Sequence, residues 1–321
     1  VCFDGDSVRT SADFTDDVSK VRRFLEEREN APWILHCEDS YYFMVGLLAM
    51  LQGGRKALVT ANRQEAFIKE IQKPGYGFLT DEPFAGATLI QDVLQNTESD
   101  GRWNTFDKDS APMVMYTSGT TGNPKGAVLS HANLITNCQQ LEKQGMDCNA
   151  SRHVLCVLPM YHAFGWTCAV LYALYCGARI IILDSFTPKE TIAVIREEQV
   201  TDMYVVPSIC SLLTKLASPE DMKTLRLVVS GGTILPLQIQ QDFIQKFHVD
   251  ICECYGLSET SPILTINPPS RPIVGSCGKI VPEVRWKIID HENQEVPLGQ
   301  TGELVVKGPN VMLGYWNLPD V

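Results

Sequence analysis

The sequence has no internal repeat, no low-complexity segment and no apolar run of membrane-spanning length. A transmembrane helix needs about 20 consecutive apolar residues. The most hydrophobic stretch, residues 166–183, is interrupted by Gly177 and Arg179. We interpret this stretch as a buried helix, a turn and a buried strand, so the sequence predicts no membrane span.

Positive charge is scarce. The chain has 27 Lys and Arg residues against 38 Asp and Glu residues, which gives a net charge of -11. Such an acidic balance argues against nucleic acid or an anionic membrane surface as the main partner. It does not argue against ATP, because a nucleotide site needs only a local positive potential and magnesium.

Cysteine pairs of the metal-binding type are also missing. None of the 11 cysteines belongs to a C-x-x-C pair, and Cys252 and Cys254 are simply neighbours on one face of a predicted strand. The start of the chain carries no secretory signal. We therefore expect reduced, mostly buried thiols in a cytoplasmic protein.

Short apolar strands alternate with amphipathic helices through most of the chain. The apolar fraction of 45% and the charged fraction of 20% are typical of a globular protein. Helices between strands indicate mainly parallel sheets that are covered on both faces. From about Arg271, glycine, proline and short alternating runs predict a small antiparallel or barrel-like unit. The expected fold class is therefore α/β, with two mainly parallel sheets flanked by helices and a small C-terminal β subdomain.

The same pattern suggests three subdomains, over residues 1–110, 111–270 and 271–321, of which the second carries the phosphate loop described next. The polar residues 96–111 are expected to link the first two. The predicted helices cover residues 16–29, 41–51, 64–71, 131–143, 164–176, 188–198, 207–217 and 236–247.

The most informative segment is residues 116–126, Tyr-Thr-Ser-Gly-Thr-Thr-Gly-Asn-Pro-Lys-Gly. Its glycines let the backbone approach a ligand closely, and its N–H groups and hydroxyls can surround an anion. Lys125 adds a mobile positive charge. A Walker loop would need G-x-x-x-x-G-K-[ST] with a helix at the lysine, but here Gly126 and a second strand follow. We interpret the segment as a strand-to-strand turn that binds nucleotide phosphates; the alternative is a flexible hairpin tip.

Three other clusters follow predicted strands. Residues 230–236 (Ser-Gly-Gly-Thr-Ile-Leu-Pro) lie where open α/β sheets bind ligands, so they suit a base or ribose, although glycine pairs there are often only geometric. Residues 253–260 offer an aromatic face, a carboxylate and hydroxyls for stacking, magnesium and phosphate, or else form an ordinary capped loop. His162 lies among aromatic residues, which suits the mouth of an apolar pocket, although a single histidine is more often structural.

Taken together, these clusters resemble the acyl-adenylate-forming ligases, which include acyl-CoA synthetases, acyl-carrier-protein synthetases and adenylation domains. The matching motifs occur in the family's order and cover essentially the whole chain. They are residues 117–126, 159–162, 231–236, 255–260 and 301–304, with Gly308 and residues 314–316.

The resemblance implies ATP-dependent activation of a fatty or aromatic carboxylic acid to acyl-AMP, with release of pyrophosphate. A thiol, of CoA or of carrier-protein phosphopantetheine, would then take the acyl group, so an acyl carrier protein is a possible partner. ATP and Mg²⁺ would be the cofactors. The resemblance implies an acid–thiol ligase; the alternative is a non-catalytic module that binds nucleotide or acyl-adenylate.

The resemblance also assigns roles to single residues. Tyr255 would stack on adenine, with the backbone of Gly231, Gly232 and Thr233 on its other side, and Gly256 is a further expected residue of the nucleotide and acyl pocket. Glu259 would bind magnesium, Thr260 the α-phosphate, and His162 the acyl pocket. With Lys125, these last three form the expected catalytic set. The residues expected to hold the β- and γ-phosphates are Thr117, Ser118, Gly119, Thr120, Thr121, Gly122, Lys125 and Gly126.

One difference from the family concerns the end of the chain. Family members continue into a Thr-Gly-Asp segment, a hinge and a mobile C-terminal domain that supplies a lysine to the adenylation transition state. These are absent from the 321 residues. We therefore expect a trimmed core whose isolated activity is impaired, because losing a cation that acts in the transition state costs orders of magnitude in rate.

Overall fold

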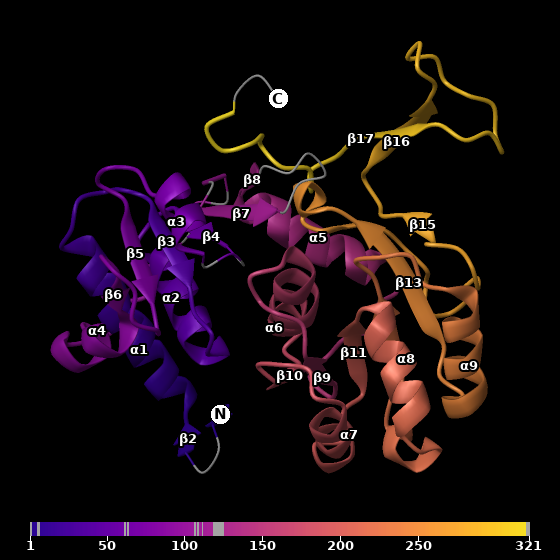
Figure 1. Cartoon of the computed structure of the whole chain (residues 1–321), viewed down its shortest axis with the longest axis horizontal. Helices are drawn as coiled ribbons and strands as arrows, with labels where there is room; N and C mark the ends of the chain where they lie inside the picture. The colour runs from indigo at the N-terminus through magenta and orange to yellow at the C-terminus, as the bar shows by residue number, and fades with distance from the viewer. Residues whose placement is uncertain are drawn as a thin grey trace. The chain divides into compact units, whose positions relative to one another are not determined.

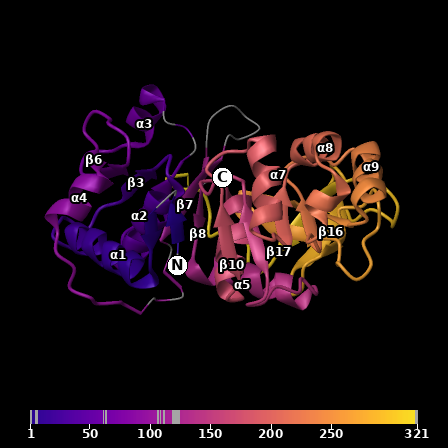
Figure 2. The same ribbon diagram turned by 90° about the horizontal axis from the view of Figure 1, so that it is seen from below.

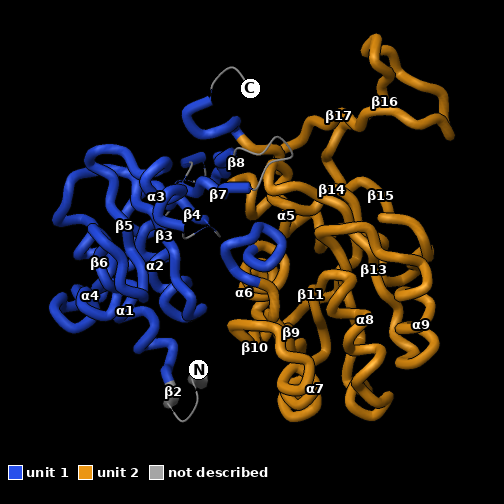
Figure 3. The backbone as a smooth tube through the Cα atoms, viewed as in Figure 1, with its two compact units in different colours: residues 1–131, 159–166, 313–321 blue, residues 132–158, 167–312 orange. Residues whose placement is uncertain are grey.

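The computed structural model describes residues 2–4, 7–60, 62, 64–105, 107, 109–110, 112–117 and 125–318. The chain divides into two compact units (Figure 3). Unit 1 consists of residues 1–131, 159–166 and 313–321, and unit 2 of residues 132–158 and 167–312. The three subdomains expected from the sequence, with boundaries at residues 110 and 270, stay a prediction.

Unit 1 contains a six-stranded sheet with the strand order β6-β5-β3-β4-β7-β8 (Figure 1). Its strands pair in parallel except for β7 and β8, which form an antiparallel pair. Buried strands such as β3 (Trp33–His36) present apolar side chains on both faces, as a covered parallel sheet requires. The other strands are β4 (Ala57–Val59), β5 (Gly77–Thr80), β6 (Thr88–Leu89), β7 (Met113–Thr117) and β8 (Lys125–Leu129). A separate antiparallel pair, β1 (Cys2–Asp4) and β2 (Ser7–Arg9), precedes them.

Four helices belong to unit 1: α1 (Ser11–Glu26), α2 (Ser40–Gln52), α3 (Glu65–Ile71) and α4 (Ile90–Asn96). The helix predicted at 16–29 begins five residues earlier, because Thr10 and Asp13 form a capping box that satisfies the first backbone N–H groups. Helix α4 was not expected from the sequence. It ends at Asn96, where the polar stretch 96–111 that was predicted to be a linker begins.

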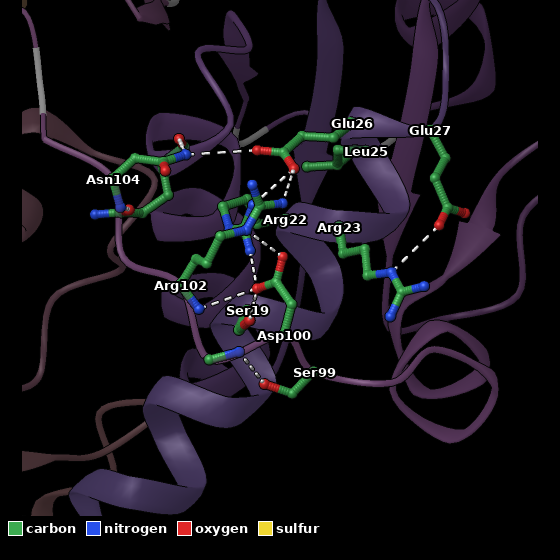
Figure 4. Close-up of polar contacts among 12 residues, drawn as sticks. Ser19, Arg22, Arg23, Leu25, Glu26, Glu27, Ser99, Asp100, Arg102 and Asn104 are labelled. Carbon is green, nitrogen blue, oxygen red and sulfur yellow. Dashed lines mark hydrogen bonds and ion pairs between the residues drawn. The ribbon is translucent and has the colours of Figure 1, made fainter.

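The polar segment after α4 is tied back to α1 (Figure 4). The carboxylate of Asp100 accepts hydrogen bonds from Ser19 at 2.9 Å, from Arg102 Nε at 2.6 Å and from Arg22. The Arg22 side chain is 1% exposed, and it also donates to Glu26 Oε2 at 2.6 Å. A buried guanidinium is costly unless it is paired, so the pairing of Arg22 with Asp100 holds this segment against α1.

Unit 2 is built on a seven-stranded sheet with the order β10-β9-β11-β12-β13-β14-β15. The first five strands are parallel and the last two are antiparallel. The strands are β9 (His153–Cys156), β10 (Arg179–Ile182), β11 (Asp202–Val205), β12 (Leu227–Ser230), β13 (Ile251–Gly256), β14 (Ile263–Ile266) and β15 (Lys279–Ile280).

Three helices, α7 (Pro188–Glu197), α8 (Pro207–Leu216) and α9 (Leu237–Phe247), lie along one side of this sheet (Figure 2). Their apolar faces form one core with the sheet, which includes Ile195, Leu213 and Phe243 beside Met203 and Val228. Helix α5 (His131–Lys143) is bound to the antiparallel part of the sheet, since Asn137 Nδ2 donates to Ile263 O at 2.8 Å. The four helices agree with their predicted ranges to within one residue at each end.

Two parts of the chain after β9 differ from the prediction. The helix expected over 164–176 is a π-helix, η1 (Phe164–Leu171), that continues as α6 (Tyr172–Tyr175). The small C-terminal β unit is the antiparallel pair β16 (Arg285–Ile289) and β17 (Glu303–Lys307), whereas β15 joins the large sheet. The expected fold class, with two mainly parallel sheets and a small β subdomain, is confirmed.

In the parts of the chain that the structure describes, no helix combines the length and hydrophobicity needed to span a membrane.

Candidate nucleotide site

The phosphate segment is a hairpin, as the sequence predicts. Thr117, the last residue of β7, pairs with Lys125, the first residue of β8. The Thr117 hydroxyl donates to Lys125 O at 3.4 Å. The intervening residues lie outside those that the structure describes, among them the predicted phosphate ligands Ser118, Gly119, Thr120, Thr121 and Gly122. The structure therefore confirms the strand-to-strand connection that distinguishes this loop from a Walker loop.

A second segment of unit 1, residues 313–318, runs along β8. Trp316 N donates to Gly126 O at 2.7 Å, and Val128 N donates to Gly314 O at 3.0 Å. A Cβ atom on Gly126 would lie 2.5 Å from a methyl group of Val114 and 3.3 Å from Trp316. Gly126 is thus required by packing within the hairpin. The sequence analysis assigned it to phosphate binding alone.

His162 lies in the turn that begins at Pro159, whose carbonyl accepts from His162 N at 3.1 Å. Its ring meets the Tyr161 ring edge to face at 5.0 Å, and Tyr161 in turn stacks against His36 at 6.4 Å. Although the His162 side chain reaches solvent, the atoms around the ring partly desolvate it, which lowers the pKa of the imidazole. His162 is therefore neutral near pH 7 and can accept a hydrogen bond or contact an apolar ligand.

In unit 2 the residues predicted to hold adenine belong to two adjacent parallel strands: Gly231–Thr233 follow β12, and Tyr255 is the second-to-last residue of β13. Ser230, at the end of β12, is in register with Glu253 of β13. Gly231–Thr233 and Tyr255 thus come together at the carboxyl edge of the sheet, where open α/β sheets bind ligands. Gly232 has a φ of +83°, a conformation that favours glycine. A hydrogen bond of 3.2 Å from Leu235 N to the Glu253 carboxylate connects the turn to β13.

Tyr255 is 42% exposed at this edge, which is unusual for a residue so close to buried strand positions. The ladder between β13 and β14 shifts register between Tyr255 and Gly256. A Cβ atom on Gly256 would lie 1.9 Å from the carbonyl oxygen of Pro262. Gly256 therefore lets the backbone of Pro262 approach closely, and the exposed ring of Tyr255 is accessible to a planar ligand.

The short 3-10 helix η3 (Ser258–Thr260) carries the remaining predicted residues. Thr260 is only 2% exposed, and its hydroxyl donates to Pro262 O at 2.7 Å. Its carbonyl accepts from Asn310 Nδ2 at 2.8 Å. Glu259 and Ser258 are partly exposed, and Glu259 O accepts from Met312 N at 2.8 Å. Thr260 thus stabilises the turn, whereas Ser258, a hydroxyl residue that was not selected from the sequence, is partly exposed.

Glu259 is the one carboxylate predicted as a metal ligand. Within the described ranges, no three His, Cys, Asp or Glu side chains gather in a way that could hold a metal ion. Mg²⁺ in nucleotide enzymes is commonly bound by one or two carboxylates together with substrate phosphates. A single accessible Glu beside the adenine edge fits an ion that arrives with the nucleotide.

An exposed tyrosine at the carboxyl edge of an open α/β sheet, and a strand-to-strand loop whose sequence is rich in glycine and hydroxyl residues, are typical of nucleotide-binding proteins. The family model of AMP-binding enzymes matches residues 21–316. The chain belongs to this family of AMP-binding enzymes.

Two relatives of this chain carry the names of CoA ligases. The chain is 30% identical over 282 residues to a 4-coumarate–CoA ligase from Pinus taeda, covering 83% of this chain and 52% of the relative. It is 33% identical over 217 residues to a long-chain-fatty-acid–CoA ligase from Bacillus subtilis, covering 65% of this chain and 38% of the relative. The chain thus spans about half the length, or less, of these relatives.

The fold is shared with solved ligases. O-succinylbenzoate coenzyme A synthetase from Bacillus subtilis, in complex with AMP, superposes with a TM-score of 0.86 at 21% identity, over 98% of this chain and 85% of that one. The anthranilate CoA ligase AuaEII in complex with anthranoyl-AMP gives a TM-score of 0.86 at 21% identity, over 98% of this chain and 68% of that one. These likenesses confirm the architecture.

Proposed function

We propose that the protein containing this chain uses ATP to activate a carboxylic acid, and that it then transfers the acyl group to a thiol. The observation that carries the proposal is the exposed Tyr255 beside the Gly231–Thr233 turn, at the carboxyl edge of a parallel sheet, in a chain of the AMP-binding family. The CoA ligases among its relatives support coenzyme A as the thiol acceptor. A carrier-protein phosphopantetheine is the second acceptor to test.

In the proposed reaction, a carboxylate oxygen attacks the α-phosphorus of ATP. A new O–P bond forms between the carboxylate and the α-phosphorus, the bond from the α-phosphorus to the oxygen that bridges it to the β-phosphate breaks, and pyrophosphate leaves with the electron pair. In the second step the thiol sulfur attacks the acyl carbon, loses its proton and displaces AMP. Both steps develop negative charge on phosphate oxygens, so positioned cations and N–H groups are the main catalytic contribution.

The residues would divide this work as follows. The hairpin from Thr117 to Gly126, with the Lys125 ammonium, would hold the β- and γ-phosphates. Tyr255 would stack on adenine opposite Gly231–Thr233. Glu259 would bind the Mg²⁺ that accompanies ATP, and that ion would neutralise phosphate charge.

Two further assignments concern the reacting groups. The neutral ring of His162 would border the acyl group. For the α-phosphate we propose Ser258 in place of Thr260, because the Thr260 hydroxyl is buried and bonded within its own turn, whereas Ser258 is partly exposed. An accessible hydroxyl can donate to a phosphate oxygen without first breaking an internal hydrogen bond.

The test of function is exchange of labelled pyrophosphate into ATP by the whole protein, in the presence of a panel of acids. The panel should contain hydroxycinnamic, benzoic and long-chain fatty acids, because the proteins that this chain resembles include ligases named for 4-coumarate, benzoate and long-chain fatty acids. We expect exchange that depends on one acid class. ATP binding without exchange for any acid would instead indicate a non-catalytic nucleotide-binding module.

A further inference from the structure

A histidine at the end of β3 contacts the turn that carries His162. His36 is the last residue of β3, and the segment 159–166 belongs to the same compact unit as this strand. The His36 ring stacks against the Tyr161 ring, with 6.4 Å between the ring centres and 28° between their planes. The Tyr161 ring in turn meets the His162 ring at 5.0 Å and 62°. Both separations lie in the range of aromatic pairs, so the fold joins three rings from two distant segments.

The ring of His36 is fixed at the carboxyl edge of the unit 1 sheet. His36 is 6% exposed, and its Nδ1 lies 3.2 Å from the carbonyl oxygen of Thr60, the residue that follows β4. Because a carbonyl oxygen can only accept, Nδ1 donates this hydrogen bond and thereby sets the orientation of the ring. Strand β4 is parallel to both β3 and β7, so Thr117, at the start of the phosphate hairpin, lies on the same edge. His36 is therefore on the side of the sheet where ligands bind in open α/β folds.

The second ring nitrogen of His36 does not contribute to stability. Nε2 is buried, and none of the residues that the structure describes forms a hydrogen bond with it. The Glu38 carboxylate is 3.7 Å away, which is beyond hydrogen-bonding distance. A buried polar atom without a partner costs free energy. A leucine at this strand end would avoid that cost, which indicates that the ring of His36 has another role.

We propose that His36 is a positioning residue for the acyl site: its ring fixes Tyr161, and Tyr161 fixes the His162 imidazole. This role rests on the proposed function, which assigns His162 to the acyl group. The turn is also held at its other end, since Trp166 N donates to His162 O at 3.0 Å and the Trp166 ring packs edge to face on Phe43 of α2 at 6.1 Å. His162 itself is exposed, so its neighbours determine where its ring lies.

A contact residue that is fixed in advance favours binding, because less ordering is needed when the ligand arrives. Without the His36 ring, Tyr161 can change its rotamer and the His162 imidazole can move. The acid should then bind more weakly. ATP should bind as before, because other residues hold it in the proposed reaction.

The first experiment uses the full chain with carbon-13-labelled histidine. The ring protons of His162, assigned with the His162→Gln variant, should show the ring-current shift of the adjacent Tyr161 ring. We expect His36→Leu to move these signals toward those of a free histidine, and His36→Phe, which retains a ring, to preserve them. Phe24→Leu is the matched control, because it removes a ring that contacts Trp33 at the opposite end of β3, at 6.0 Å.

The second experiment measures pyrophosphate exchange by the whole protein. His36→Leu should raise the KM for the acid about tenfold, because misplacing a contact residue by about 1 Å can cost up to about 100-fold. The KM for ATP should stay within about twofold, since the lost interaction serves the acid alone. His36→Phe should recover most of the affinity for the acid, and Phe24→Leu should change neither KM.

Unchanged His162 signals or an unchanged KM for the acid in His36→Leu would overturn the proposal, as would equal effects of leucine and phenylalanine at position 36. If His36→Leu does not fold, Tyr161→Leu and Tyr161→Phe make the same comparison at the middle ring, which is partly exposed. If no acid supports exchange, the proposed function fails, and the His162 signals still decide whether His36 positions this ring.

Discussion

Lys125 places its ammonium nitrogen 5.1 Å from the centre of the Tyr315 ring, at the first residue of β8. This is within the range of a cation–π interaction. The ring belongs to the segment 313–318, which is hydrogen bonded to β8 through Trp316 N and Gly126 O. The positive charge is therefore held at the turn end of the hairpin, where the sequence predicts the phosphates to bind.

We expect Lys125→Ala to weaken binding of Mg-ATP by about tenfold or more, which corresponds to about 1.4 kcal/mol. The reason is the loss of the cation at the phosphate end of the hairpin. Titration calorimetry on this chain measures the effect. The matched control is Lys56→Ala, which removes a cation 4.5 Å from the Trp316 ring on the same segment. An equal loss of affinity in both variants would contradict the assignment.

Replacing Tyr255 tests the adenine position. Removing a stacked aromatic ring costs about 1–3 kcal/mol per base in nucleic-acid complexes, so Tyr255→Ala should weaken ATP binding at least fivefold. Tyr255→Phe should retain the affinity, because the ring remains. Leu257→Ala is the control for a loss of exposed apolar surface in the same turn, since Leu257 is 46% exposed. If phenylalanine and alanine at position 255 behave alike, stacking is not the role of this residue.

The two hydroxyls of η3 should separate binding from stability. Thr260→Val removes a buried hydroxyl that donates to Pro262 O, so we expect a loss of about 1–2 kcal/mol in the free energy of unfolding. Ser258→Ala should leave stability within about 0.5 kcal/mol and weaken nucleotide binding. Urea denaturation and calorimetry on both variants measure the two effects. The reverse pattern would restore Thr260 as the phosphate ligand.

Much of this architecture could be predicted from the sequence, because the relevant signals are local. The hairpin around residues 117–125 was recognisable from an apolar strand on each side of a glycine-rich turn. The helices of unit 2 were recognisable from their apolar periodicity and from prolines at their first positions, as in α7 and α8.

The choice between Ser258 and Thr260 could not be predicted, because both hydroxyls lie in one short motif. Only the 3-10 turn decides which of them faces inward. The attachment of residues 99–104 to α1 was equally invisible, because Arg22 and Asp100 are 78 positions apart. Contacts of this kind depend on the folded chain and leave no local pattern. For the same reason, the sequence placed a linker where Asp100 is anchored.

That anchor makes a prediction about stability. We expect Asp100→Asn to lower the free energy of unfolding by about 3 kcal/mol, because Arg22 would be left buried with half of its partners. The control is Asp16→Asn, which removes an exposed ion pair with Lys20 and should cost less than about 1 kcal/mol. Equal effects of the two substitutions in urea denaturation would contradict this account.

The same carboxylate should appear in the pH dependence of stability. Burial alone would raise the pKa of Asp100, but hydrogen bonds from Arg22 and Arg102 outweigh it and hold that pKa well below its usual range. A carboxyl whose pKa is lower in the folded state stabilises fully above its unfolded pKa, about 4. This contribution is lost as the pH falls further. Between pH 5 and 3, Asp100→Asn should therefore lose less stability than the unsubstituted chain.

The most direct measurement of the central claim is a crystal structure of this chain with a non-hydrolysable ATP analogue and Mg²⁺. We predict adenine density against the Tyr255 ring and triphosphate density at residues 117–126, beside the Lys125 ammonium. Nucleotide density at another surface, or none at saturating concentration, would contradict the account.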